Sequence, residues 1–357
     1  MRTMEYHQNL PVDHSKKRNW NAASVITWFM HFGLFILTFF TTTIAGVLWL
    51  NRDPFELSNF HLGIPYSASI LFILACHEFG HYFASRYHHV EATLPYFLPF
   101  PPIPVLLQLF LNFGTFGAVI RTKSIVPSKK AMFDIGAAGP IAGFAASLLV
   151  LTYGFLHLPS RVFILSIHPD YDFILKASAS AQGLSLAFGN TLLFSGLQNL
   201  LTNPSLQFVP PLSEIYHYPF LCAGWFGLFV TALNLIPMGQ FDGGHLIYAM
   251  FGKYHQRIAR ASFYSLLALS APSISDALLR TLLGFVYKHD VGQIVPFAQY
   301  SWSAWFLWAM IALYVVKLIH PPVADETPLD NRRMIIGWIC IGIFFLSFSL
   351  NPFVVGY

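Results

Sequence analysis

Long stretches without charged side chains constrain the fold of this chain more than any other feature. Residues 19–51 contain no Asp, Glu, Lys or Arg, and only 10% of the 357 residues are charged. Soluble domains carry about 25% charged residues. A helix needs about 20 apolar residues to cross the hydrocarbon core of a bilayer, so 19–51 is long enough to span it with some tilt. The composition therefore predicts a mainly α-helical membrane protein.

Apolar runs of this kind recur along the chain, and they predict a polytopic bundle of about 6–7 membrane spans. We expect one integral membrane domain over residues 1–357, with an N-terminal span at 19–51, a core of three spans at 64–251 and C-terminal spans at 261–357. No internal repeat of the kind found in many transporters relates them. The expected spans after the first are 64–86, 131–156, 219–251, 261–279, 291–316 and 334–357.

The charged residues indicate mainly how the chain is oriented in the membrane. A basic cluster, residues 16–18, precedes the first span and places the N-terminus in the cytoplasm by the positive-inside rule. That first apolar run is too long and too far from the N-terminus for a cleavable signal peptide. The net charge of +4 gives no sign of nucleic-acid binding.

Cys76, Cys222 and Cys340 lie in apolar runs, so we expect core residues without disulfides.

Two connections between the expected spans are predicted to contain secondary structure of their own. Residues 94–104 are rich in proline, which excludes a regular helix, and 113–126 reads as a strand or hairpin on the cytoplasmic side. The edge of this small sheet either pairs with an unfolded substrate or only plugs the bundle from below. Residues 158–218 form a long external connection, in which 184–201 is expected to be an amphipathic surface helix or a re-entrant piece.

The motif His77-Glu78-Phe79-Gly80-His81 ends an uncharged apolar run in the second expected span. On a helix, side chains four apart project from one face, so both imidazoles can bind one zinc ion. Glu78 then lies close enough to act as general base toward water. His-Glu-x-x-His is the metalloprotease signature. Ionisable groups at membrane depth are costly and usually functional, which strengthens the interpretation.

Asp242 is the best candidate for a third zinc ligand. It is the only acidic or basic residue between Glu214 and Lys253, and its inferred depth matches that of the histidine pair. Pro237 should break the helix just before it, and irregular backbone at membrane depth is tolerated only beside protein or a cavity. An unpaired aspartate there costs about 2.5–3.5 kcal/mol, which a divalent cation would offset. The alternative is a structural aspartate bonded to nearby amides.

Other polar residues leave alternatives open. Asn234, one turn before the break, is either a donor to the oxyanion and a substrate clamp or a helix-packing residue. His88 and His89, with His245, are the next candidates for a ligand if Asp242 is not one. His31 is expected to bond a neighbouring helix.

The third expected span has two features of its own. Asp134 falls near its start and is expected to cap the helix. Gly139 and Gly143 should allow close helix contact.

Three classes of function compete on these residues. An intramembrane zinc endopeptidase uses all of His77, Glu78, His81 and Asp242. A metal or small-solute transporter would use the same ligands as a transit site, but it needs no base and usually shows repeats. A catalytically dead scaffold has no need of the complete set.

The motif 77–81, followed by Asn234-x-x-Pro237-x-x-x-x-Asp242-Gly243, resembles the site-2 protease family of intramembrane zinc metalloproteases. Residues 133–143 look like that family's Gly-Pro segment, and 224–245 look closest to the branch with plant plastid members and bacterial relatives. The resemblance covers roughly residues 64–251.

The resemblance implies a core of three spans, with zinc on His77, His81 and Asp242 and with Glu78 as base. It implies cleavage of single-span membrane proteins within or near the bilayer, often after a first cut by another protease, with membrane lipid as the other partner. The connection 158–218 is too short and apolar for the PDZ domain of many members. Plastid members carry long N-terminal extensions, so a prokaryotic cell membrane is expected, with the active site toward the cytoplasm.

Overall fold

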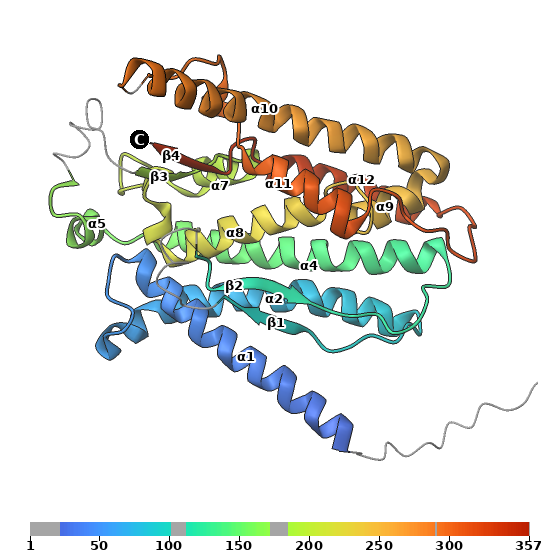
Figure 1. Ribbon diagram of the computed structural model, residues 1–357. Helices are drawn as coiled ribbons and strands as arrows, with labels where there is room; N and C mark the ends of the chain where they lie inside the picture. Colours follow the sequence, from blue (N-terminus) through green and yellow to red (C-terminus); the bar gives the residue numbers. More distant parts are fainter. Residues whose placement is uncertain (1–21, 101–111, 172–184, 290, 357) are drawn as a thin grey trace, which may run out of the picture.

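The computed structural model describes residues 22–100, 112–171, 185–289 and 291–356 (Figure 1). The basic cluster at 16–18 and part of the proline-rich stretch lie outside the described residues. The helices are α1 (Ala22–Trp49), α2 (Phe60–Tyr87), α4 (Lys129–Leu156), α5 (Arg161–Ile167), α7 (Leu192–Leu201), α8 (Pro219–Asn234), α9 (Asp242–Phe251), α10 (His255–Tyr287), α11 (Ala304–Ile311) and α12 (Asn331–Ser347).

Short elements complete the described chain. The 3-10 helices are η1 (Leu57–Asn59), η2 (Ile215–His217), η3 (Gly252–Tyr254) and η4 (Ala298–Tyr300), and Ala312–Val316 forms a π-helical turn after α11. The strands are β1 (Tyr96–Pro99), β2 (Thr115–Val119), β3 (Ser185–Phe188) and β4 (Phe353–Gly356). They make two antiparallel pairs, β1 with β2 and β3 with β4.

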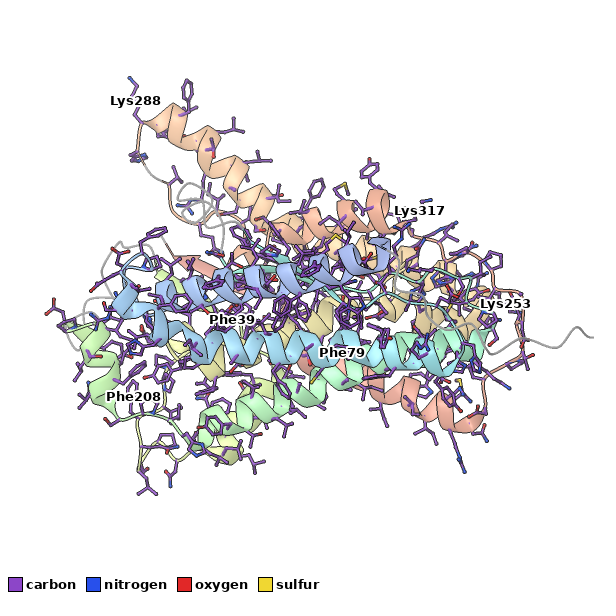
Figure 2. The ribbon with its side chains drawn as sticks, turned by 90° about the horizontal axis from the view of Figure 1, so that it is seen from below. Phe39, Phe79, Phe208, Lys253, Lys288 and Lys317 are labelled. Atoms are coloured by element: carbon purple, nitrogen blue, oxygen red, sulfur yellow. The ribbon has the colours of Figure 1, made fainter. Side chains whose placement is uncertain are left out.

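Four helical segments in the described part of the chain are long and apolar enough to cross a membrane. The fold is therefore mainly helical and of membrane type, as predicted, whereas the number of spans stays a prediction. In Figure 2, Lys253 and Lys317 lie toward one end of the helices and Phe208 toward the other, with Phe39 and Phe79 between. The four segments are Ile26–Trp49, Leu57–Tyr87, Lys129–Leu156 and Asp242–Tyr287.

Helices α2, α4 and α8 pack against one another and form the centre of the bundle, with α1 against α2 (Figure 1). Every residue from 221 to 229 of α8 is buried. A helix that is apolar on all sides belongs inside a bundle, which explains why this short helix is surrounded. Glycines bring α2 and α4 close together: a Cβ on Gly80 of α2 would lie 2.5 Å from the carbonyl oxygen of Ala138 in α4.

The helix break predicted at Pro237 is confirmed. Helix α8 ends at Asn234, and α9 begins at Asp242. Gly239 in the connecting turn has φ +53°, a region that favours glycine, and a Cβ there would lie 1.7 Å from the carbonyl oxygen of Lys317. The turn is thus held against the chain that follows α11, where the Gly239 amide donates to the carbonyl of Leu318 at 3.2 Å.

The small sheet lies beside the helices, with β1 against α1 and β2 against α2, and its position on the cytoplasmic side stays a prediction (Figure 1). His31 in the middle of α1 lies 3.0 Å, Nδ1 to oxygen, from the carbonyl of Pro95, so its predicted helix-neighbour role is instead a bond to the chain before β1. The Thr41 hydroxyl of α1 donates to the carbonyl of Gly114 at 2.6 Å. Strand β2 ends at Val119, where the β-branched run begins, and beyond it the pairing continues only as an isolated bridge between Ala92 and Thr122.

The C-terminal part corrects three expectations. The run 261–279 is the middle of α10, which continues through Pro272. The run 291–316 is not one continuous helix, since its helix begins only at Ala304, after Pro296. The run 334–357 is not one continuous helix either, because α12 stops at Ser347 and residues 353–356 form β4.

Strand β4 places the side chain of Phe353 among aromatic side chains of β3 and α8. Phe353 pairs with Phe188 of β3 in the strand register. Its ring centroid lies 5.3 Å from that of Trp225 and 5.4 Å from that of Phe229. In the external connection, β3 likewise takes the first part of the predicted helix 184–201, and α7 begins only at Leu192.

Asp134 does not cap its helix, contrary to the sequence expectation. Helix α4 starts earlier than predicted, and the Ser128 hydroxyl caps it by accepting from the amide of Ala131 at 3.1 Å. Asp134 instead accepts two bonds from the guanidinium of Arg333, at 2.8 and 2.6 Å, and lies 2.7 Å from His88 Nε2. The carboxylate therefore ties α12 and the end of α2 to α4.

Candidate metal centre

The two histidines of the motif face α4 from the buried side of α2. His77 is 5% exposed and His81 is 6% exposed, and their Nε2 atoms lie 3.1 Å apart. Glycines of α4 leave room for the rings, since a Cβ on Gly139 would lie 2.0 Å from His81 Nε2 and one on Gly143 would lie 3.0 Å from His77 Nδ1. This confirms the close helix contact predicted for the Gly139–Gly143 step.

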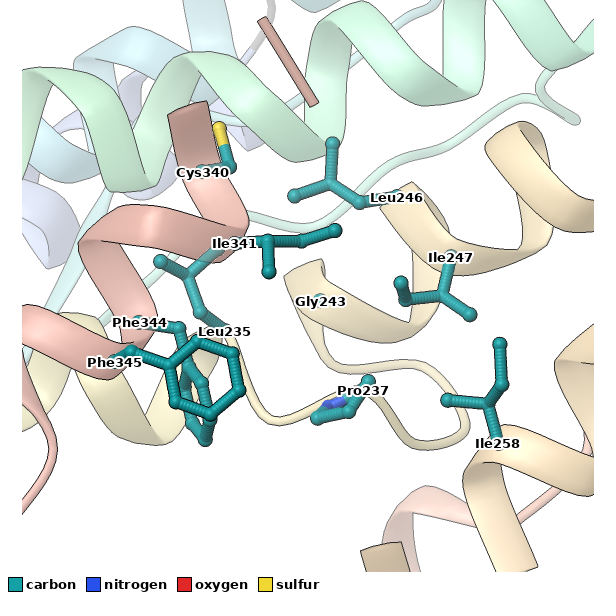
Figure 3. Close-up of a pocket in the computed structure, with 10 residues that line it drawn as sticks. All are labelled: Leu235, Pro237, Gly243, Leu246, Ile247, Ile258, Cys340, Ile341, Phe344 and Phe345. Atoms are coloured by element: carbon teal, nitrogen blue, oxygen red, sulfur yellow. The ribbon is translucent and has the colours of Figure 1, made fainter. Parts of the chain in front are cut away.

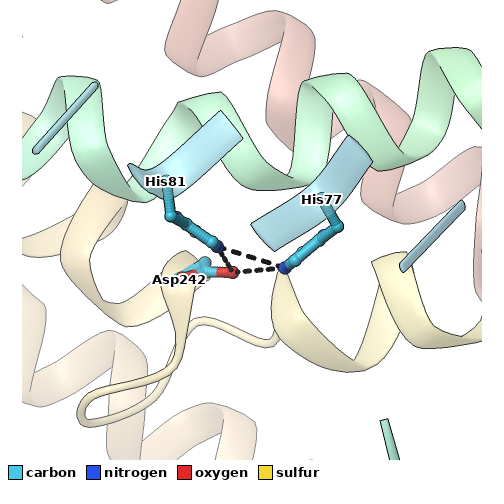
Figure 4. Close-up of side chains that lie close together, drawn as sticks. All are labelled: His77, His81 and Asp242. Carbon is cyan, nitrogen blue, oxygen red and sulfur yellow. Dashed lines mark hydrogen bonds and ion pairs between the residues drawn. The ribbon is translucent and has the colours of Figure 1, made fainter. Parts of the chain in front are cut away.

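Asp242 enters the same place from the first turn of α9 (Figure 4). Its Oδ2 lies 3.5 Å from His77 Nε2 and 3.2 Å from His81 Nε2. In a tetrahedral zinc site with bonds of about 2.0–2.1 Å, ligand atoms lie about 3.3 Å apart. The three side chains therefore fit one zinc ion, and the bend after α8 is what directs the carboxylate to them.

A backbone contact fixes which nitrogen of His81 faces this centre. His81 Nδ1 lies 2.7 Å from the carbonyl oxygen of Ile135 in α4. A carbonyl only accepts, so Nδ1 carries the hydrogen and the lone pair of Nε2 points toward His77 and Asp242. Metal-binding histidines are held by such contacts on their other nitrogen.

Glu78 and Asn234, the two other predicted site residues, also lie next to this group. Glu78 is buried, and the backbone amide of Ile120, directly after β2, lies close to its carboxylate. The amide nitrogen of Asn234, at the end of α8, lies 3.2 Å from His77 Nε2. The sheet and the end of α8 thus contribute to the surroundings of the histidine pair.

The alternative ligand candidates, His88, His89 and His245, are not part of the group formed by His77, His81 and Asp242. His88 bonds Asp134, as described above. His245 Nδ1 lies 2.7 Å from Nε2 of His320, in the chain after α11. No sequence pattern pointed to His320, because only the packing of that segment against α9 brings the two rings together. His89 has a positive φ of 56° at the end of α2 and is not part of the group.

An apolar cavity of about 190 Å³ lies beside the helix break, between the α8–α9 turn, α10 and α12 (Figure 3). Its wall contains the two residues that flank the turn, Leu235 and Gly243. The remaining lining residues are Pro237, Leu246, Ile247, Ile258, Cys340, Ile341, Phe344 and Phe345.

Sequence reasoning missed a second group of metal-ligand residues: His168, Glu214 and His217. They come from the end of α5 and from η2, in the external connection. Burial lowers the pKa of His217 to about 4 and also lowers the pKa of His168, so both rings are neutral at pH 7. Burial raises the pKa of Glu214 to about 7. No short sequence motif indicated this group, because Glu214 follows His168 by 46 residues.

Fold and site together are those of a helical membrane protein with a buried cluster of histidine and carboxylate side chains. Comparison with known protein families identifies the family of this chain. Residues 65–271 match the model of Peptidase family M50, so the chain belongs to that family. This match confirms the resemblance to site-2 proteases, because Peptidase family M50 is the site-2 protease family.

Named relatives agree with this assignment. The chain is 34% identical to "Probable zinc metalloprotease EGY1, chloroplastic" of Oryza sativa subsp. japonica over 58% of this chain and 31% of the relative. It is 32% identical to the Arabidopsis thaliana EGY1 protein of the same name, over 53% and 30%. It is 29% identical to "Probable zinc metalloprotease EGY2, chloroplastic" of Oryza sativa subsp. indica, over 77% and 46%.

The matched segments span less than half the length of these relatives. Because the relatives are named as chloroplastic, they do not support the expected prokaryotic cell membrane. No solved structure matches the chain.

Proposed function

We propose that this protein is an intramembrane zinc endopeptidase, with zinc held by His77, His81 and Asp242. One observation carries the proposal: a helix break brings Asp242 within 3.5 Å of both histidines of a His-Glu-x-x-His helix. Membership of Peptidase family M50 and relatives named as zinc metalloproteases support it. The division into a catalytic core at 64–251 with flanking spans stays part of this proposal.

Zinc, when bound, lowers the pKa of water and polarises the carbonyl to be attacked. Glu78 takes the proton from the attacking water and passes it to the leaving amine. The backbone amide of Ile120 lies close to this carboxylate. The Asn234 amide donates to the oxygen of the scissile carbonyl, where negative charge develops. The carbonyl of Ile135 keeps His81 in the tautomer that presents Nε2.

The proposed substrates are single-span membrane proteins. A peptide bond in a helix is shielded by its neighbours, so the segment to be cut must first unfold. Strands β1 and β2 form a sheet of only two strands, and Ile120, the residue after β2, lies close to Glu78. An unfolded segment that pairs with this sheet would gain backbone hydrogen bonds next to the general base. A cytoplasmic N-terminus and a site toward the cytoplasm remain parts of the proposal.

The transporter alternative receives no support. The relatives compared above are named as zinc metalloproteases, and a buried carboxylate, that of Glu78, directly follows His77 in α2. Transport needs ligands that release their ion, and it does not need that base.

Two substitutions test the proposal in detergent-purified protein and in cells with a single-span reporter that the wild type cleaves. Glu78→Gln should retain zinc and lose about 10²–10⁴-fold in cleavage, because only proton transfer is removed. Asp242→Ala should lose both zinc and cleavage. Glu91→Gln, an exposed glutamate beyond the end of α2, is the matched control and should behave as wild type. Wild-type cleavage by Glu78→Gln would refute the role of Glu78, and unchanged zinc in Asp242→Ala would refute the ligand set.

A further inference from the structure

The cluster of His168, Glu214 and His217 lies at the other end of helix α8 from the first centre. Glu214 and His217 belong to the turn that leads into α8, whereas Asn234 ends that helix beside His77. At 1.5 Å per residue, the 16 residues of α8 separate the two groups by about 24 Å. The cluster is therefore distinct from the proposed catalytic site.

Ligand atoms of the cluster are spaced as a metal requires. The Nε2 atoms of His168 and His217 lie 2.9 Å apart, and each lies 3.7 Å from Glu214 Oε2. Ligand atoms around a tetrahedral zinc ion lie about 3.3 Å apart, which is within this range. The corresponding separations at the first centre are 3.1, 3.2 and 3.5 Å.

His217 is oriented for ligation by the last residue of α1. Its side chain has no exposed surface, and its Nδ1 makes a short hydrogen bond to the carbonyl oxygen of Trp49. Nδ1 must donate in this bond, so Nε2 has a lone pair that points at His168 and Glu214. A main-chain carbonyl behind the ring is the usual partner of a metal-binding histidine.

Glu214 provides a second, independent observation. Its Oε2 is buried and has no hydrogen-bond partner among the described residues. A buried carboxylate oxygen without a partner is unfavourable unless something positive or protic lies beside it. The two histidines alone could pair with each other, His168 donating to His217, but that arrangement leaves the carboxylate unsatisfied.

We propose that His168, Glu214 and His217 form a second divalent-metal site, suited to zinc, that fastens the external connection to the ends of α1 and α8. Two imidazoles and one carboxylate are ligands that zinc prefers, and three protein ligands leave one position for water. The site's role is structural, since it joins the end of α5, the turn before α8 and, through Trp49, the end of α1.

The metal content of the full chain, purified in detergent and dialysed against micromolar zinc, tests this proposal. We expect two zinc ions per chain in wild type, one in Glu214→Gln, one in His77→Ala and none in the double variant. Glu214→Gln keeps the size of the side chain and so preserves the packing. His157→Asn, an exposed histidine at the end of α4 on the same side, is the matched control and should keep two.

The single variants separate this proposal from the proposed catalytic site. One zinc in wild type that Glu214→Gln retains and His77→Ala loses would overturn the second site alone. One zinc that Glu214→Gln loses and His77→Ala retains would support the second site and overturn the catalytic one.

Thermal unfolding gives a readout that does not depend on counting ions. In the His77→Ala background, added zinc should raise the unfolding midpoint by several degrees, because it binds only the folded chain. The same addition should leave the His77→Ala/Glu214→Gln protein unchanged. Equal responses of the two proteins to zinc would overturn the second site.

Discussion

Small residues decide whether the histidine pair can face a metal at all. His77 and His81 project into α4, and the positions opposite them are Gly139 and Gly143. By helix propensity, alanine would be better than glycine at either position by roughly 0.5–1 kcal/mol. The glycines therefore cost local stability, and what they provide is room for two imidazole rings between packed helices.

We expect Gly139→Ala to abolish zinc binding and cleavage while the protein still folds. The new Cβ would lie 2.0 Å from His81 Nε2, so the ring must move out of the ligand position. Zinc content and reporter cleavage of the purified variant measure this. Gly33→Ala in α1, where nothing lies within 4 Å of the new Cβ, is the control and should keep both. Full zinc content in Gly139→Ala would show that the ring has another way to reach the metal.

At the scale of elements, an ion pair holds the C-terminal part against the core. Arg333 of α12 donates two hydrogen bonds to Asp134 of α4, which also contacts His88 at the end of α2. Both partners of the Arg333–Asp134 pair are about a quarter exposed, at 26% and 24%. Such a two-pronged, partly buried pair contributes more than the usual surface pair. It positions α12, which further along its length contributes Cys340 and Phe344 to the cavity beside the helix break.

Arg333→Met should lower the free energy of unfolding by roughly 1–2 kcal/mol, because it removes charge-assisted hydrogen bonds and leaves Asp134 with one partner. The unfolding midpoint in detergent measures this. Arg332→Met, the exposed neighbour on the same helix, is the control and should change it little. Combining Arg333→Met with Asp134→Asn should cost less than the two single effects added together. Strict additivity would mean that the pair does not act as a unit.

For the whole molecule, the arrangement of its ends predicts a topology. Lys253 and Lys317 lie at one end of the helices, and the chain around Phe208 lies at the other (Figure 2). Basic residues favour the cytoplasmic side, so the end with Lys253 should be cytoplasmic. The proposed second metal site, in the external connection, would then lie on the opposite side of the membrane.

Cysteine labelling in intact cells checks this topology, starting from a chain whose buried Cys222 and Cys340 and half-buried Cys76 are replaced. Lys253→Cys and Lys317→Cys should react with an impermeant thiol reagent only after the membrane is opened. Leu206→Cys, which replaces an 84% exposed side chain, should react from outside. Reaction of all three from the same side would contradict the arrangement.

Features that depend on local sequence pattern were predicted correctly. Uncharged apolar runs predicted a helical membrane protein because hydrocarbon excludes charge, and four segments of the described chain have that length and composition. Four-residue spacing put His77 and His81 on one face of α2, and Pro237 predicted the break before Asp242. The family resemblance rested on the same residues.

Features that depend on packing between distant segments became visible only in the folded chain. The tertiary structure placed the Asp242 carboxylate between the histidines, paired Asp134 with Arg333, and put the small sheet beside α1 and α2. It also turned the last residues into a strand and gathered His168, Glu214 and His217. The physical reason is that periodicity reports which face of a helix is buried, whereas the partner of that face is chosen by shape and by unsatisfied hydrogen bonds across the whole bundle.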